Sequence, residues 1–209
     1  LGYINSEYQL CALYINGSSP HLRNIKVFAN GGYGIRTFAS SALLCNSLLY
    51  SNSSSNIRLD AASYARILNN TIVAAGDMGI YATGNEPLIA NNIIALNSGF
   101  GLYFPSGAPA EHHNDVYGNI KGALGGNDQL SLAASDLQVD PLLVDAATAN
   151  YHLLDASSAA NAGDNSLVGA TWTDLDGRVR IHATTVDLGA FETGSAMATR
   201  LVDGMIQKT

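Results

Sequence analysis

The chain of 209 residues is long enough for one or two ordinary domains or for one continuous repeat domain with a sizeable core. Its charged fraction is only 13%, but its apolar fraction of 47% is too high for a disordered chain. The net charge is −7 and the basic residues do not cluster, so binding to nucleic acid or to an anionic membrane is disfavoured.

A short sequence pattern repeats through the first part of the chain. Gly79-Ile80-Tyr81 returns as Gly101-Leu102-Tyr103, 22 residues later. This spacing is too short for a helical repeat and is typical of a parallel β-helix, in which each coil stacks its strands on the coil before. The predicted fold is all-β, a single-stranded right-handed parallel β-helix (solenoid), with the handedness taken from the crossover rule. The apolar position of the pattern recurs at Leu13, Ile35, Ile57, Ile80 and Leu102.

Asparagine recurs with a similar period in two further columns. Asn tolerates the left-handed backbone of a sharp corner, and its amide can bond to like amides on the coils above and below. Structural roles are therefore predicted, at the corners of the coils and in ladders along the axis. The first column is Asn24, Asn46, Asn70, Asn92 and Asn114, and the second is Asn30, Asn52, Asn97 and Asn119.

Side chains next to the inward apolar positions point outward, because successive residues of a strand alternate between its faces. This alternation predicts an outward column of aromatic and arginine side chains. Such groups can stack on sugar faces and bind carboxylates, so the column is a candidate binding surface for an acidic polysaccharide. The alternative is that they only stabilise the sheet by stacking. The column is Tyr14, Arg36, Arg58, Tyr81 and Tyr103, with Phe38 and Asp60 two residues farther along their strands.

A polysaccharide lyase would need a base on this face and a cation to neutralise the uronate carboxylate. Arg36 and Arg58 are the candidate bases, and Asp60 is the one carboxylate predicted there. One carboxylate makes a poor Ca²⁺ site, because calcium usually gathers several oxygen ligands. No other cofactor is predicted, and the catalytic residues of any such enzyme stay unknown.

His112 and His113, followed by Asp115, can be drawn as a metal cluster. Adjacent strand residues point to opposite faces, so these two histidines are not expected to share an ion. Asp174 and Asp176 hint at a calcium loop, but the glycine and the terminal Glu of that motif are not where it requires them. No metal site is predicted.

The chain divides into three predicted parts. Residues 1–119 form the regular coils, and residues 120–192, where the period is lost, form irregular coils that close the C-terminal end of the cylinder. In this closing region Asp176 or Asp187 is expected to pair with Arg180. The tail, residues 193–209, has apolar residues at roughly helical spacing, which indicates a short amphipathic helix or a linker.

The N-terminal residues align with the middle of a coil, and no polar capping element precedes them. Solenoid ends expose unpaired strand edges, which natural chains cover. We therefore expect further N-terminal coils or another protein chain to cover this end.

The motifs HHNDVYGN, VDPLL, YHLL, SSAANAG, DLDGRVRI and VDLGAFE resemble the C-terminal region of bacterial right-handed β-helix proteins of the choice-of-anchor Q type. The resemblance covers about residues 10 to 192. It implies a pectate-lyase-like β-helix in a secreted or cell-surface protein of bacterial origin, and it carries no catalytic residues. Structural roles are expected for Asp176, Arg180, Asp187 and Glu192, which belong to its most specific part.

Three functions remain open at the level of the sequence. The first is a non-catalytic extracellular or cell-surface module with a glycan-binding or structural role. The alternative is a polysaccharide lyase or another carbohydrate-active enzyme that acts on an acidic polysaccharide. The third is a subunit of a larger assembly, which the uncapped first coil suggests.

Overall fold

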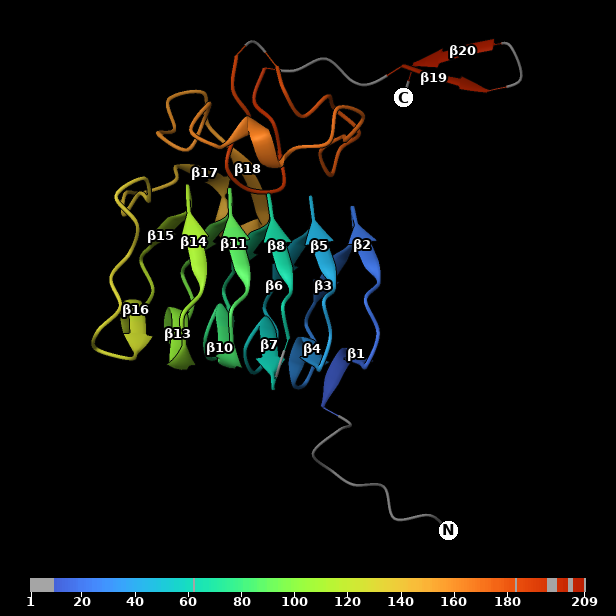
Figure 1. Cartoon of the computed structure of the whole chain (residues 1–209). Coiled ribbons are helices and arrows are strands. Elements are labelled where there is room, and N and C mark those ends of the chain that lie inside the picture. The colour runs from blue at the N-terminus through green and yellow to red at the C-terminus, as the bar shows by residue number, and fades with distance from the viewer. Residues whose placement is uncertain (1–9, 62, 183, 195–198, 203–204, 209) are drawn as a thin grey trace.

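A computed structural model describes residues 10–61, 63–182, 184–194, 199–202 and 205–208. Parallel strands stack in three sheets around a common axis, and each of the first five coils contributes one short strand to each sheet (Figure 1). The predicted fold, a right-handed parallel β-helix with about 22 residues per coil, is confirmed. No α-helix is found among the described residues, and none of their helices is long and apolar enough to span a bilayer.

Sheet A contains six strands, and sheets B and C contain five each. Sheet A consists of β1 (Cys11–Asn16), β4 (Tyr33–Phe38), β7 (Ile57–Asp60), β10 (Ile80–Asn85), β13 (Phe100–Gly107) and β16 (Gly122–Gly126). Sheet B consists of β2 (His21–Arg23), β5 (Leu43–Cys45), β8 (Arg66–Leu68), β11 (Leu88–Ala90) and β14 (Ala110–His112). Sheet C consists of β3 (Lys26–Phe28), β6 (Leu48–Tyr50), β9 (Thr71–Val73), β12 (Ile93–Ala95) and β15 (Asp115–Tyr117).

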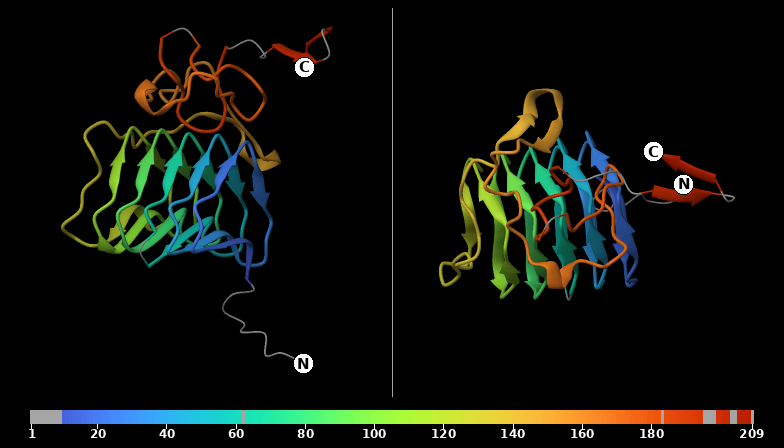
Figure 2. Two further views of the ribbon diagram at one scale, coloured as in Figure 1. Left: turned by 45° about the vertical axis from the view of Figure 1, so that its right-hand side comes forward. Right: turned by 90° about the horizontal axis from the view of Figure 1, so that it is seen from above.

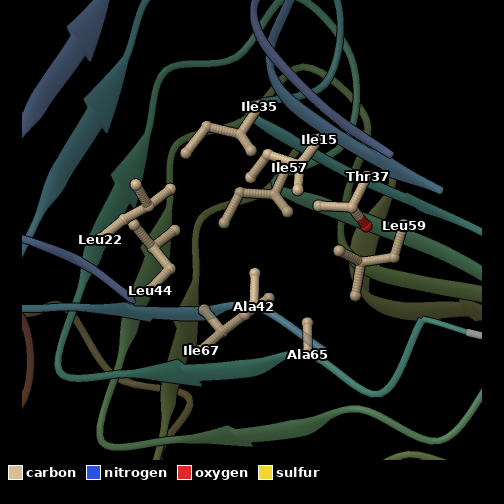
Figure 3. Close-up of a pocket in the computed structure, with 10 residues that line it drawn as sticks. All are labelled: Ile15, Leu22, Ile35, Thr37, Ala42, Leu44, Ile57, Leu59, Ala65 and Ile67. Atoms are coloured by element: carbon tan, nitrogen blue, oxygen red, sulfur yellow. The ribbon is translucent and has the colours of Figure 1, made fainter. Parts of the chain in front are cut away.

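The interior of the cylinder is packed with aliphatic side chains that repeat from coil to coil. Ile35, Ile57, Ile80 and Leu102 face inward in register from sheet A, as the period predicts. Figure 3 shows the side chains around a small apolar space among the first coils. This space measures about 10 Å³, which is room for about one water-sized sphere, so the interior is a core and not a ligand cavity.

The first predicted asparagine column combines two columns of the structure. Asn24 and Asn46 occupy the corner between sheets B and C in the left-handed conformation, with φ of 54° and 52°. In the next coils this corner is taken by Asn69 and Asn91, and in the last by His113. The spacing of 24 residues between Asn46 and Asn70 arises because the sequence alignment changes column there.

The other column is an inward ladder of amides. Asn70, Asn92 and Asn114 are fully buried, and the Oδ1 atom of each accepts a hydrogen bond from a backbone N–H on the preceding coil. The side-chain amide of Asn92 also donates to Oδ1 of Asn114 at 3.0 Å. Each amide thus joins its coil to the next, which explains why Asn recurs at a fully buried position.

The repeat continues for one coil more than the sequence predicts. β16 pairs with β13 in parallel, and Leu137 forms a parallel bridge with Asp115 in sheet C. The ladder also continues, since the Asn114 N–H donates to Oδ1 of Asp136, 22 residues later, at 2.7 Å. The sequence period seemed lost after Asn119 because Asp136 replaces Asn in the ladder and glycines replace the apolar pattern in β16.

The C-terminal segment does not close the end of the cylinder as predicted. It contains β17 (Leu143–Asp145), η1 (Ala146–Thr148), β18 (Asn150–Leu153) and η2 (Asn165–Leu167), and it runs back along the side of the coils (Figure 2). Tyr151 and Phe191 pack against outward side chains of sheet C, including Val73 and Ile93. The apolar residues of this segment therefore cover a side of the solenoid whose own side chains are apolar.

The corner asparagines hold this segment in place. The side-chain amide of Asn24 donates to the backbone carbonyl of Asp174. Asn91 makes two bonds to Asp164, donating to its carbonyl at 3.0 Å and accepting from its N–H at 2.7 Å. The left-handed corners thus serve two purposes, since they turn the chain and also present amides to the C-terminal segment.

A buried cluster of charged residues stabilises the C-terminal segment. The Arg180 side chain is fully buried, and its Nη2 atom lies 3.1 Å from Oε1 of Glu192 and donates to the backbone carbonyl of Asp187 at 3.0 Å. The Asp187 carboxylate accepts from both the N–H and the hydroxyl of Thr193. Asp174 accepts from the N–H of Glu192 at 2.9 Å, so the two motifs around Arg180 and Glu192 hold each other.

The pairings of this cluster differ from those predicted. The carboxylate partner of Arg180 is Glu192, and Asp187 contributes its backbone carbonyl. Asp176 does not pair with Arg180, because its Oδ2 atom lies 2.7 Å from Nε2 of His152 on β18. The cluster seals the segment onto the side of the coils and not onto the end of the cylinder.

The charge state of Glu192 is expected to make stability depend on pH. Burial raises the pKa of Glu192 to about 8, because it outweighs the attraction of Arg180 and because Asp187 adds repulsion. The folded state then binds this proton more tightly than the unfolded chain between about pH 4.5 and pH 8. Stability should fall as pH rises through this window, by up to about 1.4 kcal/mol per pH unit.

The variant Glu192→Gln keeps the neutral form at every pH, so it should match the parent protein near about pH 5 and lose this pH dependence. Urea unfolding at several values between about pH 5 and pH 9 measures the two slopes. Equal slopes for the parent and the variant would assign the pH dependence to other groups.

The tail contains two short strands, β19 (Thr199–Val202) and β20 (Met205–Lys208), which pair in antiparallel fashion. The predicted amphipathic helix is therefore wrong for these residues. Residues 1–9 lie outside the described residues, so the uncapped first coil and a partner chain at that end stay predictions.

Candidate functional site

The outward face of sheet A carries the predicted column of aromatic and arginine side chains. Neighbouring strands bring Tyr14, Arg36, Arg58, Tyr81 and Tyr103 into register, one from each coil. The C-terminal segment packs on the other side of the cylinder, above the strands of sheets B and C in Figure 1. We call these five residues, with Tyr33 and Phe100 described below, the sheet A strip.

Two arginines of the strip share one carboxylate. Asp60 Oδ2 accepts from Nε of Arg36 at 2.7 Å, and Asp60 Oδ1 accepts from Nε of Arg58 at 2.9 Å. The Asp60 side chain is only 10% exposed, so it lies beneath the two guanidinium groups. Such charge-assisted bonds fix the planes of the guanidinium groups and leave one net positive charge in the group of three.

Aromatic rings surround Arg58 on the outward face. Its guanidinium carbon lies 4.5 Å from the ring centroid of Tyr81 and 5.3 Å from that of Tyr33. Its Nη1 atom donates to the Tyr33 hydroxyl at 3.1 Å. Within the described part of the chain, Nη2 of Arg58 has no hydrogen-bond partner, so it can donate to an incoming anion.

The strip continues as stacked rings toward the last coils. The ring centroids of Tyr81 and Tyr103 lie 5.5 Å apart, and those of Phe100 and Tyr103 lie 5.6 Å apart. The next position in the column is Gly125, where an added Cβ would lie 2.8 Å from the Phe100 ring. The glycine therefore lets the Phe100 ring lie over the last strand of sheet A.

A shallow hollow of about 280 Å³ lies at the first coils of the strip, lined by Leu10, Tyr33, Arg36 and Arg58. This volume is at the lower limit of small-molecule pockets, which usually measure about 300–1,000 Å³. Phe38, which is 42% exposed, pairs with Asp60 in the neighbouring column. The face is thus an open surface with a depression at its first coils, a shape suited to an extended ligand.

The predicted catalytic role of Arg36 finds no support in its surroundings. Burial acts to lower the pKa of Arg36, but the hydrogen bond and charge of Asp60, with Tyr33 and Tyr14, raise it above its ordinary value. A general base needs a pKa near the working pH, so this shift has the wrong direction. Both oxygens of Asp60 are already bonded to guanidinium groups, which also makes it a poor calcium ligand.

Tyr33 and Phe100 belong to the strip although sequence reasoning missed them. Both begin a strand of sheet A, where the chain leaves a corner and the alternation of faces is not yet established. The signal available in the sequence was an aromatic residue next to the glycine of the repeated pattern, as in Tyr33-Gly34 and Phe100-Gly101.

Comparison with protein families supports the same fold. The model of the right handed beta helix region matches residues 4–136, more than half of the chain. The chain belongs to the right-handed beta helix family. Comparison with curated proteins and with solved structures gives no match.

The family match ends within the sixth coil, which the sequence period does not predict. In this right-handed β-helix, Asp136 is the last member of the inward ladder, and residue 136 is also the last residue matched. The C-terminal segment that covers sheets B and C therefore lies outside the matched region. The likeness to choice-of-anchor Q proteins and the bacterial source stay predictions.

Proposed function

We propose that the protein is a non-catalytic extracellular or cell-surface module that binds an extended acidic polysaccharide on the sheet A strip. The observation that carries this proposal is the in-register column of aromatic and guanidinium groups on an outward face. Neighbouring members of the column are spaced by about 4.8 Å, the distance between paired strands. A linear ligand that runs along the axis would therefore meet one such group per coil.

The chemistry of the strip matches the two surfaces of a uronate polymer. Stacked rings such as Tyr81 and Tyr103 offer apolar faces on which sugar rings can lie. Arg58 offers a donor beside them, and its orientation is already held by Asp60 and Tyr33. This preorganisation lowers the entropy cost of binding, since the side chain need not be ordered by the ligand.

A binding role explains the Arg36, Arg58 and Asp60 contacts better than lyase catalysis does. Asp60 holds Arg36 as a cation and bonds to both arginines, which suits recognition of carboxylates and not removal of a proton. The extracellular location and the carbohydrate ligand also agree with the resemblance to secreted β-helix proteins. A purely structural module would have the same fold but no affinity for a glycan.

Affinity electrophoresis or calorimetry with a panel of polysaccharides tests the proposal. The protein should bind a polyuronate such as polygalacturonate and bind a neutral polymer such as dextran at least about tenfold more weakly, because charged hydrogen bonds are lost. Binding should weaken as salt is raised, since the arginine contacts are partly exposed. Equal binding to both polymers, or none to any polyuronate, would contradict it.

The same samples also test the enzymatic alternative. Lysis of a polyuronate by β-elimination leaves an unsaturated sugar that absorbs ultraviolet light. The proposal expects binding without a rise in this absorbance over prolonged incubation, both with and without added Ca²⁺. A steady rise that depends on the protein would show that the strip is catalytic.

A further inference from the structure

Two histidines and an aspartate meet where the last regular coil touches the C-terminal segment. His112 is the last residue of β14, and His113 follows it in the left-handed corner with φ of 52°. Asp164 caps η2 in the C-terminal segment and reaches the same place from 51 residues farther along the chain. None of these residues belongs to the sheet A strip.

The histidine rings lie next to each other in an edge-on arrangement, contrary to the prediction that they would point to opposite faces. Their Nδ1 atoms lie 3.0 Å apart, and one atom from each histidine and from the Asp164 carboxylate all lie within 4.8 Å of one another. The prediction failed because alternation holds only inside a strand, and His113 already lies in the corner. The left-handed backbone at that residue turns its ring back toward His112.

We propose that His112, His113 and Asp164 bind one divalent transition-metal ion of the class that prefers imidazole ligands, namely zinc, nickel or copper. Two nitrogens bound to such an ion at about 2.0–2.1 Å lie roughly 2.9 Å apart at a right angle and roughly 3.3 Å apart at a tetrahedral angle. The observed 3.0 Å between the Nδ1 atoms lies within this range. The imidazoles therefore need little movement to become ligands.

The third ligand is held in position by the chain around it. The Asp164 backbone is bonded twice to Asn91, the corner residue one coil before His113. One oxygen of its carboxylate accepts from the Ser166 N–H at 2.8 Å, which orients the carboxylate, and a carboxylate has enough lone pairs to accept this bond and also bind an ion. Because the ligand atoms of the three residues lie within 4.8 Å of one another, a side-chain movement of at most about 1.5 Å would bring the carboxylate to ligand spacing.

The ligand set fixes the class of ion. Two imidazoles and one carboxylate are typical of zinc and other first-row transition metals, whereas calcium and magnesium prefer sets of oxygen ligands. Three protein ligands leave at least one coordination position for water or for a group of another molecule. The ion would also join β14 to the C-terminal segment, so its binding should stabilise the contact between them.

Metal binding to the untagged full chain, after treatment with a chelator, tests this inference. Calorimetry should find one Zn²⁺ or Ni²⁺ per chain, whereas Mg²⁺ and Ca²⁺ should not bind there. At a metal concentration about 100-fold above Kd, the unfolding midpoint should rise by roughly 5–10 °C. Hydrogen exchange of residues 163–168 should slow in the presence of the metal, because the loop that carries Asp164 becomes fixed.

Matched variants show whether these residues are the ligands. His113→Ala and Asp164→Asn should each weaken binding at least about tenfold, and Asp164→Asn retains a side chain able to cap η2. His182→Ala, which removes an exposed histidine elsewhere, should bind as the parent does. Absence of stoichiometric binding, or equal binding by the parent and both ligand variants, would overturn the inference. A loss of metal affinity in the His182→Ala control as large as that in the ligand variants would also overturn the inference.

Discussion

The variant Arg180→Ala is expected to lose about 3–5 kcal/mol of stability, because it removes the buried cation of a cluster of acidic groups and leaves them without its positive charge. Glu192 and Asp187 are 2% and 1% exposed, and Asp174 is fully buried. Nη2 of Arg180 lies 3.1 Å from Glu192 Oε1, so this buried acidic group loses its charged hydrogen-bond donor directly. The C-terminal segment should unfold first in this variant, because the cluster joins the motif around Arg180 to the motif around Glu192.

Trp172 makes this effect measurable, since it is the single tryptophan of the chain and packs on sheet B from the C-terminal segment. Urea unfolding followed by tryptophan fluorescence should shift to lower urea in the variant, before the circular dichroism of the coils changes. Arg178→Ala is the control, because Arg178 is half-buried and donates to the Glu192 carbonyl at 3.0 Å, and it forms no ion pair with the residues that the structure describes. A loss below about 1 kcal/mol for Arg180→Ala would mean that the cluster does not hold the segment.

The variant Asn92→Ala is expected to lose about 2–4 kcal/mol, because it breaks the inward ladder in the middle of the solenoid. The Oδ1 atom of Asn92 accepts from both the N–H and the side-chain amide of Asn70. Its own amide donates to the carbonyls of Ile67 and Ala90 and to Oδ1 of Asn114. All of these groups are buried, so their lost bonds are not replaced by water.

Asn30→Ala provides the matched control at the first coil, where the amide is partly exposed and bonds to Phe28 and Asn52. It should cost below about 1 kcal/mol, since water can replace its bonds. Chemical denaturation of both variants, followed by circular dichroism, measures the difference. Equal losses at the two positions would show that burial of the ladder contributes nothing.

The fold was predictable because the same residue types recur at the same positions of successive coils. An inward aliphatic position recurs in every regular coil and a buried amide in most of them, so the spacing alone indicates a solenoid. The corner and ladder positions are adjacent, and both accept Asn, which is why Asn24 and Asn46 were aligned with Asn70. Only backbone conformation distinguishes them, since the corner residues have positive φ.

The course of the C-terminal segment could not be read from the sequence. It is held by contacts between residues far apart in the chain, such as Asn91 with Asp164 and Asn24 with Asp174. The segment itself has no period, so nothing in it indicates which surface it covers. One signal was present in the coils, because the outward positions of sheet C are apolar, including Val73 and Ile93.

The sequence predicts the residues of the candidate site that lie inside strands, but not those at strand ends. Alternation of faces holds inside strands, so the sequence period places Arg36, Arg58 and Tyr81 on one face, and the strand register agrees. It does not hold at strand ends, where Tyr33 and the adjacent histidines His112 and His113 lie. The sharing of Asp60 by two arginines also depends on side-chain geometry that spacing does not specify.

Binding of a polyuronate by two double variants tests the central claim most directly. Arg58→Ala/Tyr81→Ala removes one guanidinium and one ring from the sheet A strip, whereas Arg66→Ala/Tyr64→Ala removes the same groups from exposed positions outside the strip. Titration calorimetry should show an affinity at least about tenfold lower for the first variant and an unchanged affinity for the second. Equal affinities of the two variants for the polyuronate would contradict the assignment of the sheet A strip as the binding surface.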